Sequence, residues 1–225
     1  AIYTAAGVDY IDVAAEESIV HAAKKGIEWA KKFFKNSPGL MISISDGNDI
    51  HFRKAKFDPL KCPSNCSRPC EKVCPTFAID ISGIKESKCY GCGRCIKSCP
   101  LNLISEYEYN LSKYDLATTL QKTKPNAVEI HTRINHLDSF AKVVSILKTS
   151  ETKLDKISIS CGLNQSFKKL QEPKDLLKAL WERYDILEEL NIPLIWQLDG
   201  RPMSGDLAPT TSRDTVLLFE IIGSD

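Results

Sequence analysis

Segments with strand-like and helix-like patterns alternate along most of this 225-residue chain, and the alternation predicts an α/β fold of parallel βα units. Short runs rich in Ile, Val and Leu are typical of buried strands, and the segments after them carry apolar residues at helical spacing. Because 43% of the residues are apolar, the chain can bury a substantial core. A cysteine-rich stretch interrupts the alternation, which predicts a separate module inserted in one βα loop.

The expected elements follow in chain order. Residues 1–7 have the pattern of a last helical turn with a glycine stop, so the chain is expected to be part of a longer one. Strands are expected at 8–14, 40–45, 127–131, 156–160 and 193–198. Helices are expected at about 16–35, 112–122, 137–148, 173–190 and 213–222.

These strands predict the architecture and its boundaries. Five are visible and a (β/α)8 barrel needs eight, so we expect a partial TIM-like barrel, with an open doubly wound sheet as the alternative. Residues 1–50 would form the first part of the α/β domain, 51–105 the inserted module, and 106–225 the rest of the α/β domain, truncated at its end. Loops that follow the strands lie on one face in either architecture, and functional groups collect there.

Eight cysteines form two runs inside the inserted stretch. The second run has Cys89, Cys92, Cys95 and Cys99-Pro at the C-x2-C-x2-C-x3-C-P spacing of bacterial ferredoxins. The first run is looser, with C-x3-C-x3-C-x3-C-P spacing at Cys62, Cys66, Cys70 and Cys74. In the ferredoxin pattern the fourth cysteine of each run binds the other cluster, so Cys62, Cys66 and Cys70 are expected to share a cluster with Cys99, and Cys89, Cys92 and Cys95 with Cys74.

The spacing therefore predicts two [4Fe-4S] clusters in a ferredoxin-like module whose clusters face the strand-end loops. Because the first run is irregular, its cluster could be a [3Fe-4S] centre. Zinc sites usually take two separated cysteine pairs, and a disulfide framework is typical of much smaller secreted chains. A radical-SAM triad would need C-x3-C-x2-C, which the first run misses by one residue.

Charge is distributed unevenly around these cysteines. Residues 51–100 hold ten Lys and Arg against four Asp and Glu, while the whole chain has a net charge of only +1. We interpret the local excess as compensation for two clusters that each carry about −2 with their thiolates. The balance gives no reason to expect nucleic-acid binding, and the sequence has no apolar run of transmembrane length. So many thiols indicate a reducing compartment.

A second candidate site follows the last expected strand. In the loop 199–206, charges come from Asp199, Arg201 and Asp206, and a hydroxyl from Ser204. Gly200 and Gly205 would allow the backbone to approach a ligand closely. The loop could therefore bind a small anionic ligand such as a phosphate or carboxylate. The alternative is a rigid turn in which Arg201 pairs with Asp199 or Asp206.

Other candidates each have an ordinary structural explanation. Cys161 ends a strand and is either a reactive thiol or a small buried residue. His131, with Arg133 and His136 nearby, could act as a base, although strand-end and capping roles explain these residues. Asp46, Asp49 and His51 could bind a cation or form a turn. Three basic residues precede the first cysteine run and are expected to tune its cluster or to dock an acidic redox partner, or else to be solvated surface: Arg53, Lys54 and Lys56.

Four strings together carry a family resemblance. They are 46–59 (DGNDIHFRKAKFDP), the two cysteine runs, and 197–206 (QLDGRPMSGD). On these strings, the chain resembles the light-dependent period (LdpA) family of cyanobacteria and their plastid relatives. The resemblance implies an iron–sulfur protein that feeds photosynthetic redox state into the circadian clock through clock-input proteins. It places the protein in the cyanobacterial cytoplasm, or in the chloroplast stroma of a eukaryote, and it supplies no reaction.

The leading functional hypothesis is therefore a redox sensor or electron carrier, and not an enzyme. The alternative is an oxidoreductase whose ferredoxin-like module passes electrons to a flavin or small substrate at the strand-end face. In a third reading the clusters only stabilise the fold.

Overall fold

A parallel sheet of five strands forms the centre of the α/β part. The computed structural model describes residues 1–47, 53–108, 113–132, 135–162 and 173–199, together with 213, 215–216 and 218–220. The strands lie side by side in chain order: β1 (Tyr10–Ala14), β2 (Gly39–Ser45), β7 (Ala127–His131), β8 (Lys156–Gly162) and β9 (Leu194–Asp199). All neighbouring pairs are parallel, as the alternation of strands and helices predicts.

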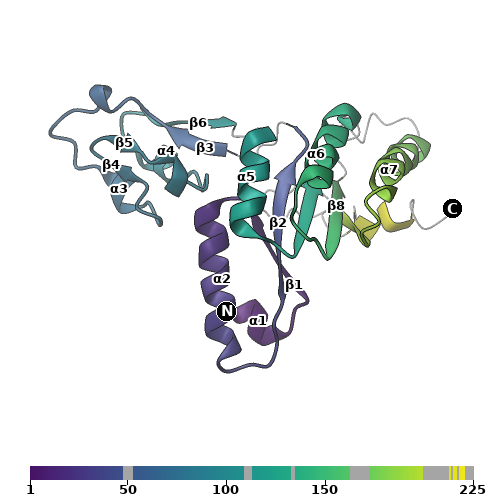
Figure 1. Ribbon diagram of the computed structural model, residues 1–225. Helices are drawn as coiled ribbons and strands as arrows, with labels where there is room; N and C mark the ends of the chain where they lie inside the picture. Colours follow the sequence, from purple (N-terminus) through teal and green to yellow (C-terminus); the bar gives the residue numbers. More distant parts are fainter. Residues whose placement is uncertain are drawn as a thin grey trace.

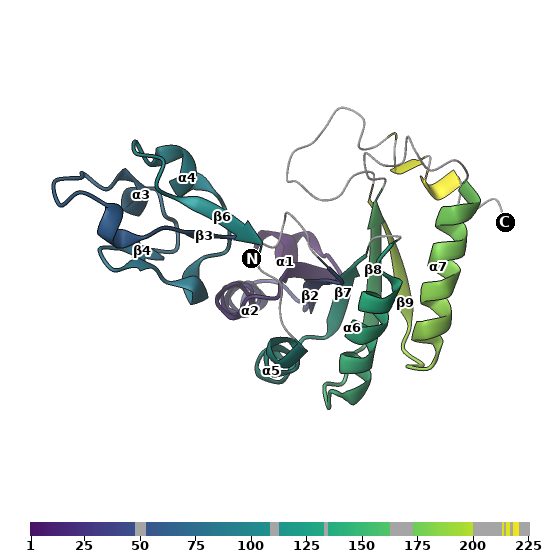
Figure 2. The ribbon, with the colours of Figure 1, turned by 90° about the horizontal axis from the view of Figure 1, so that it is seen from above.

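Helices cover one side of this sheet. Figures 1 and 2 show α2 (Glu17–Lys31), α5 (Lys113–Thr123), α6 (Leu137–Thr149) and α7 (Pro173–Glu188) along the same side, with α1 (Ile2–Ala6) beside α2. The core fills the space between sheet and helices, where Ile42, Val128 and Ile157 are completely buried. A doubly wound sheet reverses its strand order at a switch point and carries helices on both faces. The described strands have no such reversal, so that alternative does not fit.

The expected elements agree with the structure to within a few residues, with two differences. Helix α2 ends at Lys31, before the aromatic pair Phe33-Phe34 that the helical pattern had included. Strand β1 is only half-buried, with Asp12 exposed, because it is the edge strand of the sheet. Of the expected last helix, the described residues are helical and Leu218 is buried.

The inserted module has its own fold. Its elements are β3 (Arg53–Lys56), η1 (Pro59–Lys61), α3 (Pro69–Lys72), β4 (Ile79–Asp80), β5 (Gly83–Ile84), η2 (Glu86–Lys88), α4 (Arg94–Ser98) and β6 (Ser105–Glu108). The first and last strands pair antiparallel, and so do the two middle ones. The strands β3 and β6 were not predicted. A small apolar core, including Ala55, Ile79 and Ile104, lies between these pairs.

The module lies at one flank of the α/β part. Figures 1 and 2 show it next to the N-terminal end of α2, to one side of the sheet instead of over the ends of the strands. Lys54 of the module pairs with Glu16 in the loop after β1, and the expectation that the clusters face the strand-end loops stays a prediction. None of the helices in the described part of the chain is long and apolar enough to cross a membrane.

Candidate metal centre

The two cysteine runs have matching backbones. Each begins directly after a short 3-10 turn, and Cys62 (φ −83°, ψ 120°) and Cys89 (φ −81°, ψ 118°) adopt nearly the same conformation there. Each continues into a short helix that buries its third cysteine, Cys70 in α3 and Cys95 in α4. Each ends in Cys-Pro, and the residue two positions after the proline adopts a left-handed backbone conformation, with φ 52° at both Phe77 and Asn102. The module is therefore an internal repeat that the different spacing of the runs conceals.

The strand pairing joins the two halves of this repeat. Strand β3 precedes the first run and β6 follows the second, and they pair along their lengths, while β4 and β5 pair in the middle of the module. The last cysteine of each run therefore lies close to the other run.

Four thiols surround one cavity as a result. Its lining includes Cys89, Cys92 and Cys95 from the second run together with Cys74 from the first. Apolar residues close the rest of the wall, among them Ala55, Ala78, Ile79 and Ile84. Among the described residues no three His, Cys, Asp or Glu side chains converge closely enough to hold a single ion. The four thiols thus surround a space instead of meeting at one point.

At this cavity the pKa of Cys95, inside helix α4, is shifted in the opposite direction from that of Cys74, which precedes a proline. Burial, and then the charges of Cys89 and Cys92, raises the pKa of the Cys95 thiol to about 11. Burial also acts on Cys74, but its pKa is lowered because the Ala78 N–H lies 3.2 Å from its sulfur and the Thr76 hydroxyl 3.7 Å away. The sulfur of Cys74 is thus prepared to carry negative charge.

The remaining four cysteines repeat this arrangement at the other run. Burial raises the pKa of Cys62 and of Cys70, and in both cases the charge of Cys99 adds to the rise, with Cys66 also acting on Cys62. The structure therefore brings Cys99 of the second run to the cysteines of the first. Its own pKa is lowered, because backbone N–H groups, including that of Leu103 at 3.4 Å, outweigh burial.

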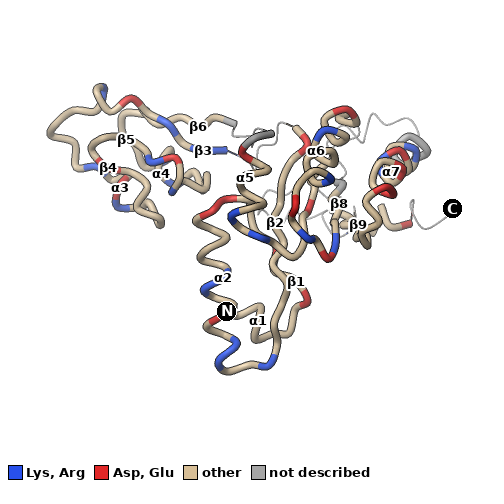
Figure 3. The backbone as a smooth tube through the Cα atoms, in the orientation of Figure 1, with Lys and Arg blue, Asp and Glu red and all other residues tan. Residues whose placement is uncertain are grey.

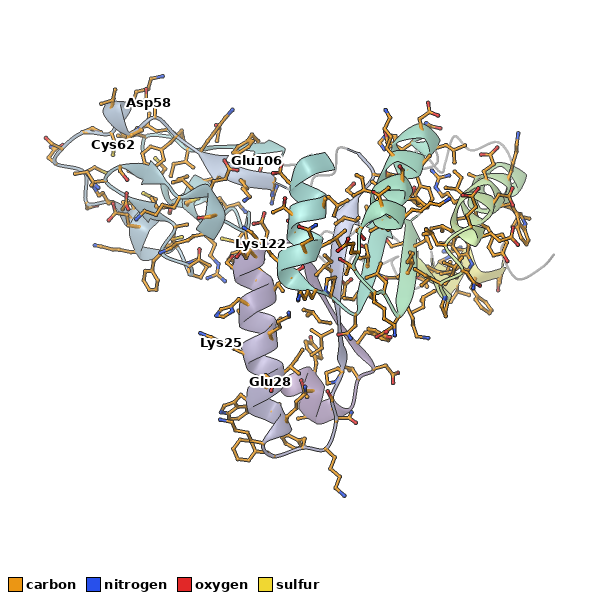
Figure 4. The ribbon with its side chains drawn as sticks, in the orientation of Figure 1. Lys25, Glu28, Asp58, Cys62, Glu106 and Lys122 are labelled. Carbon is orange, nitrogen blue, oxygen red and sulfur yellow. The ribbon has the colours of Figure 1, made fainter. Side chains whose placement is uncertain are left out.

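These donor sets fit iron–sulfur clusters chemically. Thiols that raise one another's pKa resist deprotonation together, and bound iron cations would relieve that repulsion. Backbone N–H groups directed at sulfur are donors that tune cluster potentials. Figure 4 shows Cys62 at the outer end of the module, whereas Cys89 follows η2, the turn that contacts α2. One cysteine group thus lies outside and the other near the α/β part.

Glycine is required at one position of the second run. Gly91 has φ 78°, and a Cβ there would lie 2.0 Å from the carbonyl oxygen of Arg53. Gly93, with φ 71°, has more space around it. Its counterpart in the first run is Arg68, which adopts φ 49° and pairs with Glu71 at 2.8 Å. The first run therefore places a side chain in a conformation that favours glycine.

The three basic residues before the first run have different roles. Arg53 pairs with Glu106 at 2.8 Å on the surface, and the Lys56 ammonium lies 5.3 Å from the centre of the Tyr107 ring. Lys54 is only 3% exposed, so the expectation that it belongs to a solvated or partner-docking surface is wrong.

Lys54 instead ties the module to the α/β domain. Its ammonium pairs with Glu16 at 3.0 Å and donates to the backbone carbonyl of Glu86 at 2.9 Å. Burial raises the pKa of Glu16, and Lys54 opposes that rise. The next residue, Ala55, has its N–H 3.5 Å from the sulfur of Cys89. No sequence pattern points to Glu16 as the partner, because it lies far away along the chain.

A buried polar network lies where the chain leaves β2 for the module. Thr132 donates to Asp46 at 2.5 Å, Nε of Arg183 donates to Thr132 at 2.7 Å, and Nδ1 of His136 lies 3.2 Å from the second oxygen of Asp46. Burial raises the pKa of Asp46 against the opposing effects of these partners. Of the proposed cation ligands, Asp49 and His51 lie outside the described residues, and Asp46 has these structural partners.

The sheet face opposite the helices is unusually polar near its strand ends. His131 is 7% exposed, with Nδ1 at 2.6 Å from the Ser160 hydroxyl and 3.8 Å from Glu129. Ser158 and Gln197 follow on the neighbouring strands, 3.4 Å apart. Strands of a parallel sheet are usually apolar on both faces, so the polar residues on this face are an exception. Arg133, the Cys161 side chain and the 199–206 loop beyond the backbone of Asp199 lie outside the described residues.

Comparisons with known proteins identify both parts of the chain. The model of the LdpA Fe-S cluster-binding domain matches residues 62–110, and that of the Light dependent period A C-terminal domain matches residues 119–224. Light dependent period A of Synechococcus elongatus is 39% identical over 215 residues, which cover 95% of this chain and 58% of the relative. Protein Pixie of Drosophila melanogaster is 29% identical over 85 residues, 32% of this chain and 13% of that protein. No solved structure matches the chain.

Proposed function

The chain belongs to the light dependent period A family, and from this premise we propose that it relays the redox state of a photosynthetic cell to the circadian clock through two iron–sulfur clusters. The chain spans 58% of the length of its cyanobacterial relative, so every statement about the activity of the whole protein is part of this proposal. The observation that carries it is the cavity walled by one cysteine of the first run and three of the second.

The proposed ligands follow from this exchange between runs. Cys89, Cys92, Cys95 and Cys74 hold the cluster near the α/β domain. The outer cluster is held by Cys62, Cys66, Cys70 and Cys99. The matching backbones and the pairing of β3 with β6 and of β4 with β5 support a ferredoxin-like module. The cluster near the α/β domain, called the inner cluster below, is [4Fe-4S]. The outer cluster is [4Fe-4S] or [3Fe-4S].

Residues around a bound cluster would set its reduction potential. A bound cluster supplies a one-electron couple whose potential depends on charge, hydrogen bonds to sulfur and solvent access. The N–H groups of Ala55, Ala78 and Leu103 are directed at cysteine sulfurs and would stabilise added negative charge. The outer position of Cys62 makes its cluster the entry point for electrons from a redox partner.

The remaining assignments follow from the same proposal. The α/β domain, 1–50 with 106–225, is part of a TIM-like barrel, in agreement with strands in chain order and helices on one side. The module comprises residues 51–105. Redox proteins and clock-input proteins are the proposed partners, and the cytoplasm of a cyanobacterium is the proposed location.

Anaerobic purification followed by an EPR redox titration tests the relay. Iron and acid-labile sulfide should amount to two clusters per chain, and both EPR signals should appear and disappear reversibly at potentials the cell can reach. Clusters that are present but cannot be reduced reversibly would leave only a stabilising role and would refute the relay.

A second candidate function is favoured by the polar sheet face around His131, Glu129 and Ser160. It is an oxidoreductase in which the module passes electrons to a flavin or to a small substrate at the strand ends, with the 199–206 loop binding an anionic group. Stoichiometric flavin in the same preparation would favour this enzyme. Flavin-free protein that pulls down clock or photosynthetic proteins would favour the sensor.

A further inference from the structure

Aromatic side chains gather at the end of the molecule opposite the strand ends. Trp29, Phe33 and Phe34, at the C-terminal end of α2, are 55%, 66% and 44% exposed. The rings of Trp29 and Phe33 pack against each other, with centroids 5.1 Å apart. Helix α1 lies beside the same half of α2 and adds Tyr3 at 68% exposure (Figure 1). Single exposed apolar residues are ordinary, but a group of large aromatic ones marks an interaction surface.

Lysines are frequent in the segment that carries Trp29, Phe33 and Phe34. Residues 24–35 contain five lysines and one acid, Glu28. Lys24 is directed inward to the carbonyl of Thr123, and Glu28 pairs with Lys31 at 2.9 Å. Figure 3 shows blue segments along this half of α2 and the turn after it, and Figure 4 shows Lys25 directed away from the helix.

The spacing puts both kinds of side chain on one stripe. Lys25, Trp29 and Lys32 follow at intervals of four and three residues, and such positions share one face of a helix. In the described part of the chain, no acidic side chain pairs with Lys25 or Lys32. Their charge is therefore available to an anionic partner.

We propose that this α1–α2 tip, comprising Tyr3, Lys25, Trp29, Lys32, Phe33 and Phe34, docks on the surface of an anionic lipid bilayer. Trp and Tyr prefer the level of the headgroups, and Lys side chains beside them reach the anionic phosphates. Helix α2 lies on the bilayer surface through its C-terminal end and does not span it. This inference does not depend on the iron–sulfur proposal, because the module occupies another side of the molecule (Figure 1).

Vesicle flotation with the full-length protein tests the proposal. The protein should float with vesicles in which about a third of the lipid is phosphatidylglycerol and not with pure phosphatidylcholine vesicles, and salt should weaken binding by screening. The double substitution Lys25→Gln/Lys32→Gln should weaken binding about 25-fold, from about fivefold per lysine. Lys178→Gln, at an exposed position on α7, is the matched control.

Tryptophan quenching identifies the docking surface. Brominated lipid should quench Trp29 fluorescence, so quenching should disappear in Trp29→Phe and persist in Trp181→Phe, since Trp181 is equally exposed, at 57%, but lies on α7. Circular dichroism checks that each variant is folded.

Three results would overturn the proposal. They are failure of the wild-type protein to float with the anionic vesicles, quenching that survives in Trp29→Phe, and a dimer that dissociates on Trp29→Phe substitution, which would make the tip a contact between copies. None of these results bears on the cluster content measured by EPR.

Discussion

Lys54→Met should weaken the attachment of the module to the α/β domain. The ammonium of Lys54 is almost completely buried and is shared by the Glu16 carboxylate at 3.0 Å and the Glu86 carbonyl at 2.9 Å. Methionine keeps most of the volume of the side chain but leaves Glu16, whose side chain is 19% exposed, without its cation. Removing one partner of a buried pair costs about 3–5 kcal/mol. We expect the lower end, about 3 kcal/mol, because Glu16 retains some access to water.

This loss should depend on pH in a defined direction. Burial already raises the pKa of Glu16 in the folded protein, and Lys54 opposes that rise, so its removal raises the pKa further. A carboxyl whose pKa is raised on folding favours the folded state while it is protonated, and this contribution is lost as the pH rises through the raised pKa. The penalty of Lys54→Met should therefore be larger at pH 8 than at pH 5.

Urea unfolding at these two pH values, followed anaerobically by circular dichroism, measures the effect. A loss of about 3 kcal/mol corresponds to a fall in the urea midpoint of about 1–3 M, because m is about 1–3 kcal/mol per M of urea. The double variant Lys54→Met/Glu16→Gln should recover most of the stability, because no buried charge is left unpaired. Lys122→Met, which breaks an exposed pair with Glu17, should change nothing measurable. An unchanged urea midpoint in Lys54→Met, or a double variant no more stable than the single one, would refute the reasoning.

Three further predictions concern the cysteine runs and the polar network. Cys99→Ser should remove the EPR signal of the outer cluster and Cys74→Ser that of the inner one; the reverse assignment would contradict the exchange between runs. Gly91→Ala should reduce iron content and stability far more than Gly93→Ala, because only the first places a methyl group against a backbone carbonyl; equal effects in iron assays and urea unfolding would contradict this. Asp46→Asn should remove a stability decrease that the wild type shows as pH rises from about 4 through the raised pKa of Asp46, and parallel pH profiles of the two proteins would show that Asp46 does not cause it.

Much of the fold could be predicted because its elements are locally encoded. Buried strands such as β2 and β8 are continuous apolar runs, and α6 carries its apolar residues at helical spacing. Strands β3 and β6 were missed for a physical reason. Arg53–Lys56 has three basic residues in four, and its partner Ser105–Glu108 lies about fifty residues away, so only the folded module reveals the pairing.

For the candidate site, the cysteines could be proposed as ligands from the sequence, but the backbone and the buried charges around them could not be predicted. Cysteine spacing carries the chemistry, because three of the four proposed ligands of each cluster lie close together along the chain and the fourth follows from the ferredoxin pattern. Backbone detail is not carried by spacing: Arg68 occupies the left-handed position that Gly93 fills in the second run. Charge alone does not reveal burial either, and Lys54 shows this most clearly. A lysine that lies between Arg53 and Lys56 in the sequence resembles solvated surface until Glu16, thirty-eight residues earlier, is placed against it.

Buried polar groups lie where the chain enters the module, and one of them joins the module to the α/β domain. At the end of β2, Asp46 is held by Thr132 and His136, and a side chain on Gly47 would collide with the His136 ring. Shortly afterwards, Lys54 binds Glu16 at the start of α2. Such contacts are directional, since a buried carboxylate or ammonium tolerates few orientations of its partners. An apolar interface would let the module slide, whereas the Lys54–Glu16 pair holds it in one orientation, with Cys89 toward the α/β domain and Cys62 outward (Figure 4).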